Sequence, residues 1–246
     1  MSGAGFENCF LGYREALTEN CVGGNIMLLN SALEVAEIEA LIATVRASWS
    51  NTSFTVLVDP RDPEWRERLG QLREVGVSGI KFHCYIQQLS EVDFASCVAL
   101  SILAQSLGLV VMIDTSYGSL DMYRFDNLRL AAAIATQVRH VPVVLLHSGG
   151  ARCIEALLLA DAADNVYLET SFSLPYYLGS SIERDLAFAY RKLGDERVLY
   201  GSDFPYVGLE ESKDKFLGFL EHWRFSTQAV ERMLRWNGMA VLRVDG

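Results

Sequence analysis

The chain has 246 residues, of which 50% are hydrophobic, and it carries a formal net charge of −10 at pH 7. A chain of this length and composition can bury a large core, and an α/β barrel of this size commonly forms one domain. The acidic balance argues against a nucleic-acid backbone or an anionic membrane as the main partner, because both would repel the protein. We therefore expect a small-molecule substrate. The oligomeric state stays open, with a homo-oligomer as one alternative.

The cysteines are odd in number and widely spaced, without a Cys-x-x-Cys pair. This usage fits free thiols in a reducing compartment better than a disulfide framework or a zinc knuckle. Residues 1–10 lack the basic and apolar segments of a secretory signal, and the apolar stretch from Cys97 to Ile113 is too short and too interrupted to span a membrane. We therefore expect a cytoplasmic protein. We also expect a single domain over residues 1–246, because no linker or repeat marks a boundary.

Short apolar runs rich in β-branched residues alternate along the chain with longer amphipathic runs. Runs of this length and composition are typical of strands that are buried on both faces of a parallel sheet. The predicted strands are Asn25–Leu29, Phe54–Val58, Gly79–His83, Val110–Asp114, Val143–His147, Val166–Thr170 and Val198–Ser202.

Helix signals lie between these strands. A capping box of Ser31 with Glu34 predicts the start of the first helix, over Ala32–Trp49. Repeated strand-helix units of this kind require a parallel sheet, either doubly wound or closed into a barrel. A second helix is expected to start at Asp62-Pro63 and to end at Gly76, and a third to start at Ser90, paired with Asp93, and to end at Gly108. Further helices are expected around Leu128–Val138, Ile154–Ala163, Glu183–Leu193, Asp214–Trp223 and Thr227–Trp236, and Asn237-Gly238 is expected to stop the last of them.

The last predicted strand runs into glycine, Ser202 and Asp203, and Pro205 then removes a backbone donor and ends the strand. Asp203 therefore lies at the carboxyl end of a strand, where the loops of a parallel α/β protein gather and where catalytic groups are found. We take Asp203 as the first candidate for function.

Titratable residues also stand at the ends of other strands, namely His83, Asp114 and His147, while Glu169 lies within the Val166–Thr170 run. Such groups converge on one point only if the sheet closes, which favours a barrel over an open sheet. No glycine-rich phosphate loop follows the first clear strand, so a dinucleotide-binding fold is disfavoured.

Several segments repeat the pattern of a known family: Gly79–His83, Val144–Gly150, Asn165–Glu169, Leu199–Pro205 and Trp236–Gly238. Together they resemble the amidohydrolase superfamily, in the amidohydrolase-related branch that includes decarboxylases and lactonases. The resemblance covers nearly the whole chain from about Tyr13 onward. It implies a single (β/α)₈ TIM barrel, with an atypical or missing first strand as one alternative.

The chain departs from the family pattern at the expected metal ligands. The first strand of the family normally ends in His-x-His, and the best counterpart, Glu7–Gly12, places Asn8 and Phe10 there. Neither is a good transition-metal ligand. The resemblance implies a degenerate site, in which His147, Asp203 and Asp114 hold one divalent ion, zinc or manganese, or in which no metal is bound.

The candidate residues also have structural interpretations. Lys81 and His83 alternate onto one face of their strand and could orient a substrate anion, but Lys81 could equally neutralise Asp114 or Glu169. Arg152 could bind a carboxylate or be solvated. We expect His140 and His222 to lie on the surface. We expect Cys84 and Cys153 to be packing residues.

Two functions from different classes follow. The first is a hydrolase or lyase acting on a small carboxylate, lactone or amide, with Asp203 as general base and His147 polarising the carbonyl. The substrate contacts would come from Lys81, His83, Asp114 and Ser202. The alternative is an inactive barrel with a ligand-binding or assembly role, which the loss of the first-strand histidines would explain.

Overall fold

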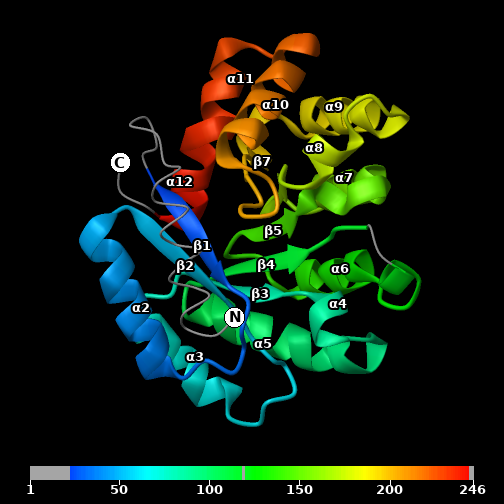
Figure 1. Cartoon of the computed structure of the whole chain (residues 1–246). Helices are drawn as coiled ribbons and strands as arrows, with labels where there is room; N and C mark the ends of the chain where they lie inside the picture. The colour runs from blue at the N-terminus through cyan, green and yellow to red at the C-terminus, as the bar shows by residue number, and fades with distance from the viewer. Residues whose placement is uncertain (1–22, 118–119, 244–246) are drawn as a thin grey trace.

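The computed structural model describes residues 23–117 and 120–243 of the chain. In this part a single parallel sheet of seven strands forms the centre, and the strands pair in the order in which they occur in the sequence. Figure 1 shows the sheet curled, with helices arranged around its outer side. The strands are β1 (Gly24–Leu28), β2 (Thr52–Leu57), β3 (Gly79–Phe82), β4 (Val110–Asp114), β5 (Val143–Leu146), β6 (Val166–Glu169) and β7 (Val198–Leu199).

This arrangement is the α/β TIM-barrel fold, as predicted. Each of the seven predicted strands is present, and the largest difference is at β7, which ends at Leu199 rather than at Ser202. The expected counterpart of a first barrel strand, Glu7–Gly12 with Asn8 and Phe10, lies outside the described residues.

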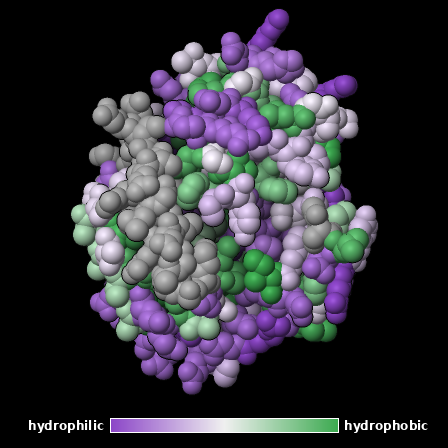
Figure 2. All heavy atoms as spheres, viewed as in Figure 1, coloured by the Kyte–Doolittle hydropathy of each residue, from purple (hydrophilic) through white to green (hydrophobic). Residues whose placement is uncertain are grey.

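A helix or a helical turn follows almost every strand. No helix in the described ranges is both long and apolar enough to cross a membrane. Figure 2 shows a surface on which hydrophilic residues predominate and hydrophobic ones occur in small groups. The helices are α2 (Val35–Ser48), α3 (Trp65–Glu74), α4 (Cys84–Gln87), α5 (Phe94–Ser106), α6 (Asn127–Gln137), α7 (Cys153–Asp161), α8 (Ser173–Tyr177), α9 (Ser181–Leu193), α10 (Leu209–His222), α11 (Thr227–Glu231) and α12 (Asn237–Leu242).

Two predicted helix signals, a capping box and a stop, were wrong, and the helix predicted around Asp214–Trp223 begins earlier, at Leu209. The capping box that starts α2 is formed by Glu34 with Glu37, because the preceding residues form a turn and the carbonyl of Ser31 accepts a hydrogen bond from Arg68 at 3.1 Å. At the other end of the chain, Asn237-Gly238 does not stop the helix. A five-residue π-helical segment over Arg232–Trp236 leads directly into α12, and Asn237 is the first residue of that helix.

The alternation of side chains along the strands divides the core in two. Because successive strand residues point to opposite faces, Ile80 and Phe82 of β3 pack outward against the helices while Lys81 points into the barrel. The inner core is smaller, and α12 contributes Val241 to it (Val110, Met112, Val144, Leu146, Leu199 and Val241). In Figure 1, α12 lies beside β1 at the end of the barrel where the strands begin. The opposite end, at the carboxyl ends of the strands, is left for polar residues.

Candidate active site

The inward positions of neighbouring strands change from apolar to polar toward their carboxyl ends. On β4 the inward residues are Val110, Met112 and then Asp114, and on β6 Glu169 ends the strand. Both carboxylates are buried, as is the Lys81 ammonium group on β3. Burying such groups without partners would be costly, so their mutual contacts decide whether the site is stable.

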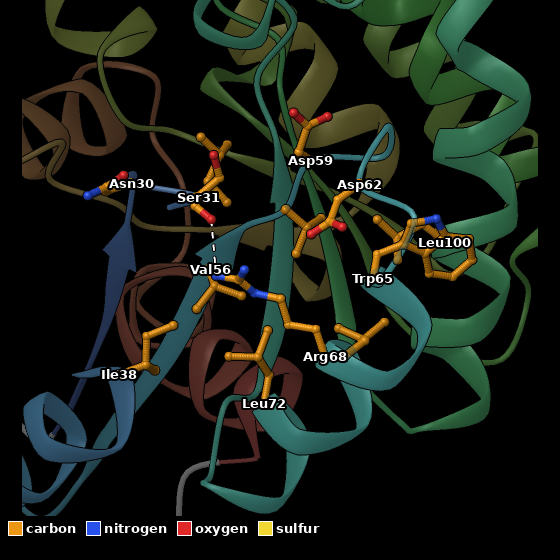
Figure 3. Close-up of a pocket in the computed structure, with 13 residues that line it drawn as sticks. Asn30, Ser31, Ile38, Val56, Asp59, Asp62, Trp65, Arg68, Leu72 and Leu100 are labelled. Carbon is orange, nitrogen blue, oxygen red and sulfur yellow. Dashed lines mark hydrogen bonds between the residues drawn. The ribbon is translucent and has the colours of Figure 1, made fainter. Parts of the chain in front are cut away.

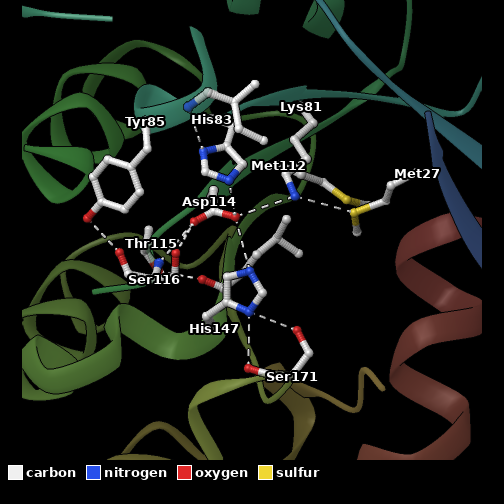
Figure 4. A network of polar contacts seen from close by, with 12 residues as sticks. Met27, Lys81, His83, Tyr85, Met112, Asp114, Thr115, Ser116, His147 and Ser171 are labelled. Carbon is white, nitrogen blue, oxygen red and sulfur yellow. Dashed lines mark hydrogen bonds and ion pairs between the residues drawn. The ribbon is translucent and has the colours of Figure 1, made fainter. Parts of the chain in front are cut away.

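Asp114 is the centre of these contacts (Figure 4). One carboxylate oxygen, Oδ2, lies 3.5 Å from Lys81 Nζ, 3.3 Å from His83 Nε2 and 3.1 Å from His147 Nε2. The other oxygen, Oδ1, accepts hydrogen bonds from the hydroxyl of Ser116 at 2.6 Å and from its backbone N–H at 3.1 Å. Burial alone would raise the pKa of Asp114, but His147 and Lys81 hold it well below its usual range. The structure therefore brings Lys81, His83, Asp114 and His147 together at one place.

The two histidines that share Asp114 differ at their other ring nitrogen. Nδ1 of His83 lies 3.4 Å from the backbone N–H of Ile86 and accepts from it, so the ring is a neutral donor to Asp114 through Nε2. Burial lowers the pKa of His83 to about 4, although the charge of Asp114 opposes the shift. This side chain is uncharged at neutral pH.

Nδ1 of His147 instead faces two oxygens of Ser171, the carbonyl at 3.1 Å and the hydroxyl at 3.0 Å. With an acceptor at each nitrogen, the doubly protonated ring is the form that satisfies both sides. Burial alone would lower the pKa of His147, but attraction by Asp114 and a hydrogen bond to it raise the pKa to about 9. His147 is a cation at neutral pH.

His147 begins a tight turn in which successive residues have positive φ angles. The values are 67° for His147, 50° for Ser148, 81° for Gly149 and 56° for Gly150. Side chains disfavour this region, and a Cβ at Gly150 would lie 2.8 Å from the backbone nitrogen of Tyr117. The two glycines therefore allow the chain to turn sharply at the barrel mouth.

Asp203 lies in the loop that follows β7, with φ of 59°, and its backbone carbonyl accepts from Tyr206 N–H at 2.9 Å. Its carboxylate makes no hydrogen bond or ion pair with another described residue. Burial raises the pKa of Asp203 to about 6, which the nearby His147 charge opposes and Glu169 reinforces. Asp203 is thus a largely ionised carboxylate at neutral pH, within the electrostatic influence of His147 but not ion-paired to it.

Ser171, Glu169 and Phe172 were not among the predicted site residues. Glu169 accepts from the backbone N–H of His147, and Ser171 bonds to its ring. Phe172 packs edge-on against His147, with ring centroids 6.0 Å apart, and stacks on the exposed Tyr176 at 5.3 Å. The available signal was the position of these residues at and just after the end of a predicted strand.

The other predicted residues have local partners. The hydroxyl of Ser202 accepts from the backbone N–H of Phe204 at 3.3 Å and so holds the loop before Asp203. Arg152 donates to Asp126 at 3.0 Å and to Glu155, which accounts for its charge without a substrate. The remaining positions agree with their predicted structural roles: buried free thiols at Cys84 and Cys153, and exposed rings at His140 and His222.

The residues at the barrel mouth do not fit a metal ion. Within residues 23–117 and 120–243, no group of three or more histidine, cysteine or carboxylate side chains is arranged to hold one. Around Asp114 Oδ2 the groups that converge are an ammonium and two imidazole N–H donors, whereas a metal needs several lone pairs pointing at one centre. The predicted ligand set of Asp203, His147 and Asp114 is therefore not assembled in this region, because His147 is already bonded on both nitrogens.

A separate cavity lies on the outer side of the barrel, between α2, α3 and β2 (Figure 3). Its walls are mainly apolar core residues such as Ile38, Val56 and Leu72, and Arg68 closes one side by donating to the carbonyl of Ser31. None of the predicted site residues lines it. We therefore place the candidate active site at the polar cluster of Figure 4 and not here.

Comparisons with known proteins agree with this fold. An uncharacterized TIM-barrel protein from Bordetella bronchiseptica is 18% identical, with a TM-score of 0.64 over 83% of this chain and 72% of its own. A protein assigned as a 2-pyrone-4,6-dicarboxylic acid hydrolase from Acinetobacter baumannii, with citric acid bound, is 15% identical, with a TM-score of 0.67 over 95% of this chain and 88% of its own. A second protein with that assignment, from Pseudomonas putida, is 20% identical, with a TM-score of 0.57 over 85% of this chain and 77% of its own.

The comparison with curated proteins finds no match. A family model described as amidohydrolase matches residues 34–244, which include the whole Asp114 cluster and Asp203. The earlier resemblance is thereby confirmed, and the chain belongs to the amidohydrolase family.

Proposed function

We propose that this protein is a hydrolase that opens a small lactone or amide at the carboxyl-end mouth of the barrel. Membership of the amidohydrolase family supports hydrolysis as the class of reaction. The structural relatives include proteins assigned as hydrolases of 2-pyrone-4,6-dicarboxylic acid, a cyclic ester, which supports a lactone as the first substrate to test. These likenesses establish the fold, so the reaction itself has to be argued from the site.

The observation that carries the proposal is a buried Asp203 carboxylate, unpartnered in the described structure, whose pKa responds to the charge of His147. The Asp203 carboxylate has no partner in the described structure, and its raised pKa makes it a stronger base than an ordinary aspartate. His147, whose charge acts on Asp203, is held as a cation by Asp114. A base that takes a proton from water and a fixed positive charge that stabilises the oxyanion are two groups that assist attack of water on a carbonyl.

In this mechanism Asp203 removes a proton from water as the water oxygen bonds to the carbonyl carbon of the substrate. The negative charge that develops on the carbonyl oxygen is stabilised by the nearby charge of His147. The bond to the leaving oxygen or nitrogen then breaks, and protonated Asp203 returns the proton to it. Lys81 and His83 do not contact the substrate anion directly in this scheme, because both are turned toward Asp114.

The test is a screen with dihydrocoumarin, an uncharged lactone, alongside 2-pyrone-4,6-dicarboxylate and the lactam counterpart of dihydrocoumarin. Ring opening is followed by proton release in weakly buffered solution. We expect turnover of at least one lactone by the parent protein and none above background by His147→Gln. Absence of turnover by the parent for all three, with one of them bound in calorimetry, would instead favour the binding-only barrel.

A further inference from the structure

Glu169 is a buried carboxylate whose two oxygens are both occupied by groups around His147. Oε2 accepts from the backbone N–H of His147 at 3.1 Å and from the hydroxyl of Ser171 at 2.7 Å. Oε1 accepts from the backbone N–H of Ser171 at 3.0 Å. The side chain therefore joins the end of β6 to the start of the His147 turn.

The same contacts reach the ring of His147. The Ser171 hydroxyl donates its hydrogen bond to Glu169. The lone pairs of the hydroxyl oxygen are therefore left to accept from Nδ1–H of His147 at 3.0 Å. Glu169 thus holds His147 twice, directly at the backbone and through Ser171 at the ring. The backbone of His147 has φ of 67°, a conformation that persists only where its surroundings enforce it.

The neighbouring strand leaves room for this carboxylate. A Cβ placed on Gly201, just after β7, would overlap with Oε1 of Glu169 and lie 3.2 Å from Cβ of Ser171. Glycine at this position therefore lets the β7 backbone pass directly beside Glu169. Three strands, β5, β6 and β7, meet at this one carboxylate.

We propose that Glu169 and Ser171 are positioning residues that fix the backbone and the ring of His147. Neither needs to touch the substrate: Ser171 orients Nδ1, which leaves Nε2 on Asp114, and Glu169 holds both Ser171 and the turn. The role in turnover rests on the proposed function, whereas the hold on His147 does not.

The primary variant is Ser171→Ala, which removes the hydroxyl between Glu169 and the ring. Ser148→Ala is the matched control, since the Ser148 hydroxyl is also buried and donates to the main-chain oxygen of Glu169 at 2.7 Å. The readout is the ¹⁵N NMR spectrum of protein labelled at its four histidines, in which His147→Gln identifies the resonances of His147.

We expect Ser171→Ala to shift the Nδ1 resonance of His147 clearly and Ser148→Ala to leave it nearly in place. The two variants should have similar melting temperatures. With a lactone that the parent turns over, Ser171→Ala should lower kcat on the order of 10- to 10²-fold while KM changes little. Glu169→Gln should lower kcat further, because its amide NH₂ would face the donors that now bond to Oε1 or Oε2.

An Nδ1 resonance that is unchanged in Ser171→Ala, or shifted equally in Ser148→Ala, would overturn the proposal. So would equal losses of kcat in the two serine variants, since a merely structural role predicts that pattern. A parent protein that turns over no lactone, but whose Nδ1 resonance responds to Ser171→Ala alone, would count against the proposed function and not against the hold on His147.

Discussion

His83 and His147 approach the same oxygen of Asp114, at 3.3 Å and 3.1 Å, yet their pKa values move in opposite directions. His83 follows β3 and caps α4, where its Nδ1 meets a backbone N–H donor. His147 follows β5, where its Nδ1 meets oxygens of Ser171. Sharing a carboxylate therefore does not make two histidines alike.

Burial lowers the pKa of both rings, but at His147 the charges of Asp114 and Glu169 overcome it, whereas at His83 burial prevails. The partners at the second ring nitrogen agree with these two charge states. A donor at Nδ1 requires a lone pair there and fixes the neutral form, while an acceptor at Nδ1 favours the cation. Environments that push two titratable groups apart in this way commonly separate their chemical roles. Under the proposed function, this separation assigns the fixed positive charge to His147 and the role of base to Asp203.

The largest effect is expected for Asp203→Asn, which tests whether His147 could itself be the base. The amide keeps the shape of the side chain but cannot accept a proton at neutral pH, so turnover should fall about 10²–10⁴-fold. The melting temperature should stay close to that of the parent, because the Asp203 carboxylate has no partner among the described side chains. Full activity in a stable Asp203→Asn protein would show that Asp203 is not the base.

Asp114→Asn breaks the shared contact itself. It leaves the buried Lys81 ammonium without its counter-charge, and removing one partner of a buried ion pair typically costs about 3–5 kcal/mol. His83→Gln is the control, because it removes one neutral donor from the same oxygen and should cost only about 0.5–1.5 kcal/mol. Urea unfolding of both variants measures the difference. Equal losses would mean that Lys81 does not depend on Asp114.

Gly201→Ala tests how tightly the His147 side of the site is packed. The new methyl group would overlap with Glu169, so we expect a loss of about 1–3 kcal/mol in the free energy of unfolding. Gly218→Ala is the control, since nothing lies within 4 Å of that Cβ position in α10, and alanine there should stabilise by about 0.5–1 kcal/mol. A neutral Gly201→Ala would show that the carboxylate of Glu169 can move aside.

The pH profile of kcat/KM should be bell-shaped and should sharpen the contrast between the histidines. Activity rises as Asp203, whose pKa is influenced by the charges of His147, Glu169, Lys81 and Asp114, loses its proton near pH 6. It falls as His147 loses its charge near pH 9, by about tenfold per unit beyond each limit. His83 titrates near pH 4, so His83→Gln should leave both limbs in place, and a limb that moves in that variant would contradict the assignment.

The raised pKa of His147 also predicts a change in the stability of the fold with pH. The pKa of His147 in the folded protein, about 9, lies above its ordinary value of 6.5, so its contribution to stability is complete below about pH 6.5. That contribution is lost as pH rises from there through about 9. Melting temperatures of the parent and of His147→Gln should therefore converge as the solution becomes alkaline.

The strands could be predicted because each is a short apolar run whose pattern follows from burial on both faces. The same logic placed His83, Asp114 and His147 at strand ends, and these three meet in the structure. What the chain alone does not reveal is which group each one turns toward. The Nδ1 partners are a backbone amide and a serine distant in sequence, and no spacing rule connects Ser171 to His147.

The predicted metal ligands do not form a group that could hold an ion among the described residues, for a related reason. Residue type suggested lone pairs at His147 and Asp114, but the fold surrounds Asp114 with N–H donors and uses both nitrogens of His147. Helix ends were likewise set by distant partners. Asn237, expected to stop a helix, instead donates to the carbonyls of Asp195 at 2.6 Å and Val198 at 2.8 Å.

That last contact bears on when the site can form during protein synthesis. Strand β7 has only two residues, and later residues hold it in place. Asn237 donates to the carbonyl of Val198, and the N–H of Tyr200 donates to the carbonyl of Met233 at 2.9 Å. Asp203 lies four residues after this strand, so the loop that holds it depends on residues that leave the ribosome thirty or more positions later. A nascent chain would form the Asp114 cluster before Asp203 is fixed, and the proposed base would be in place only once α12 docks.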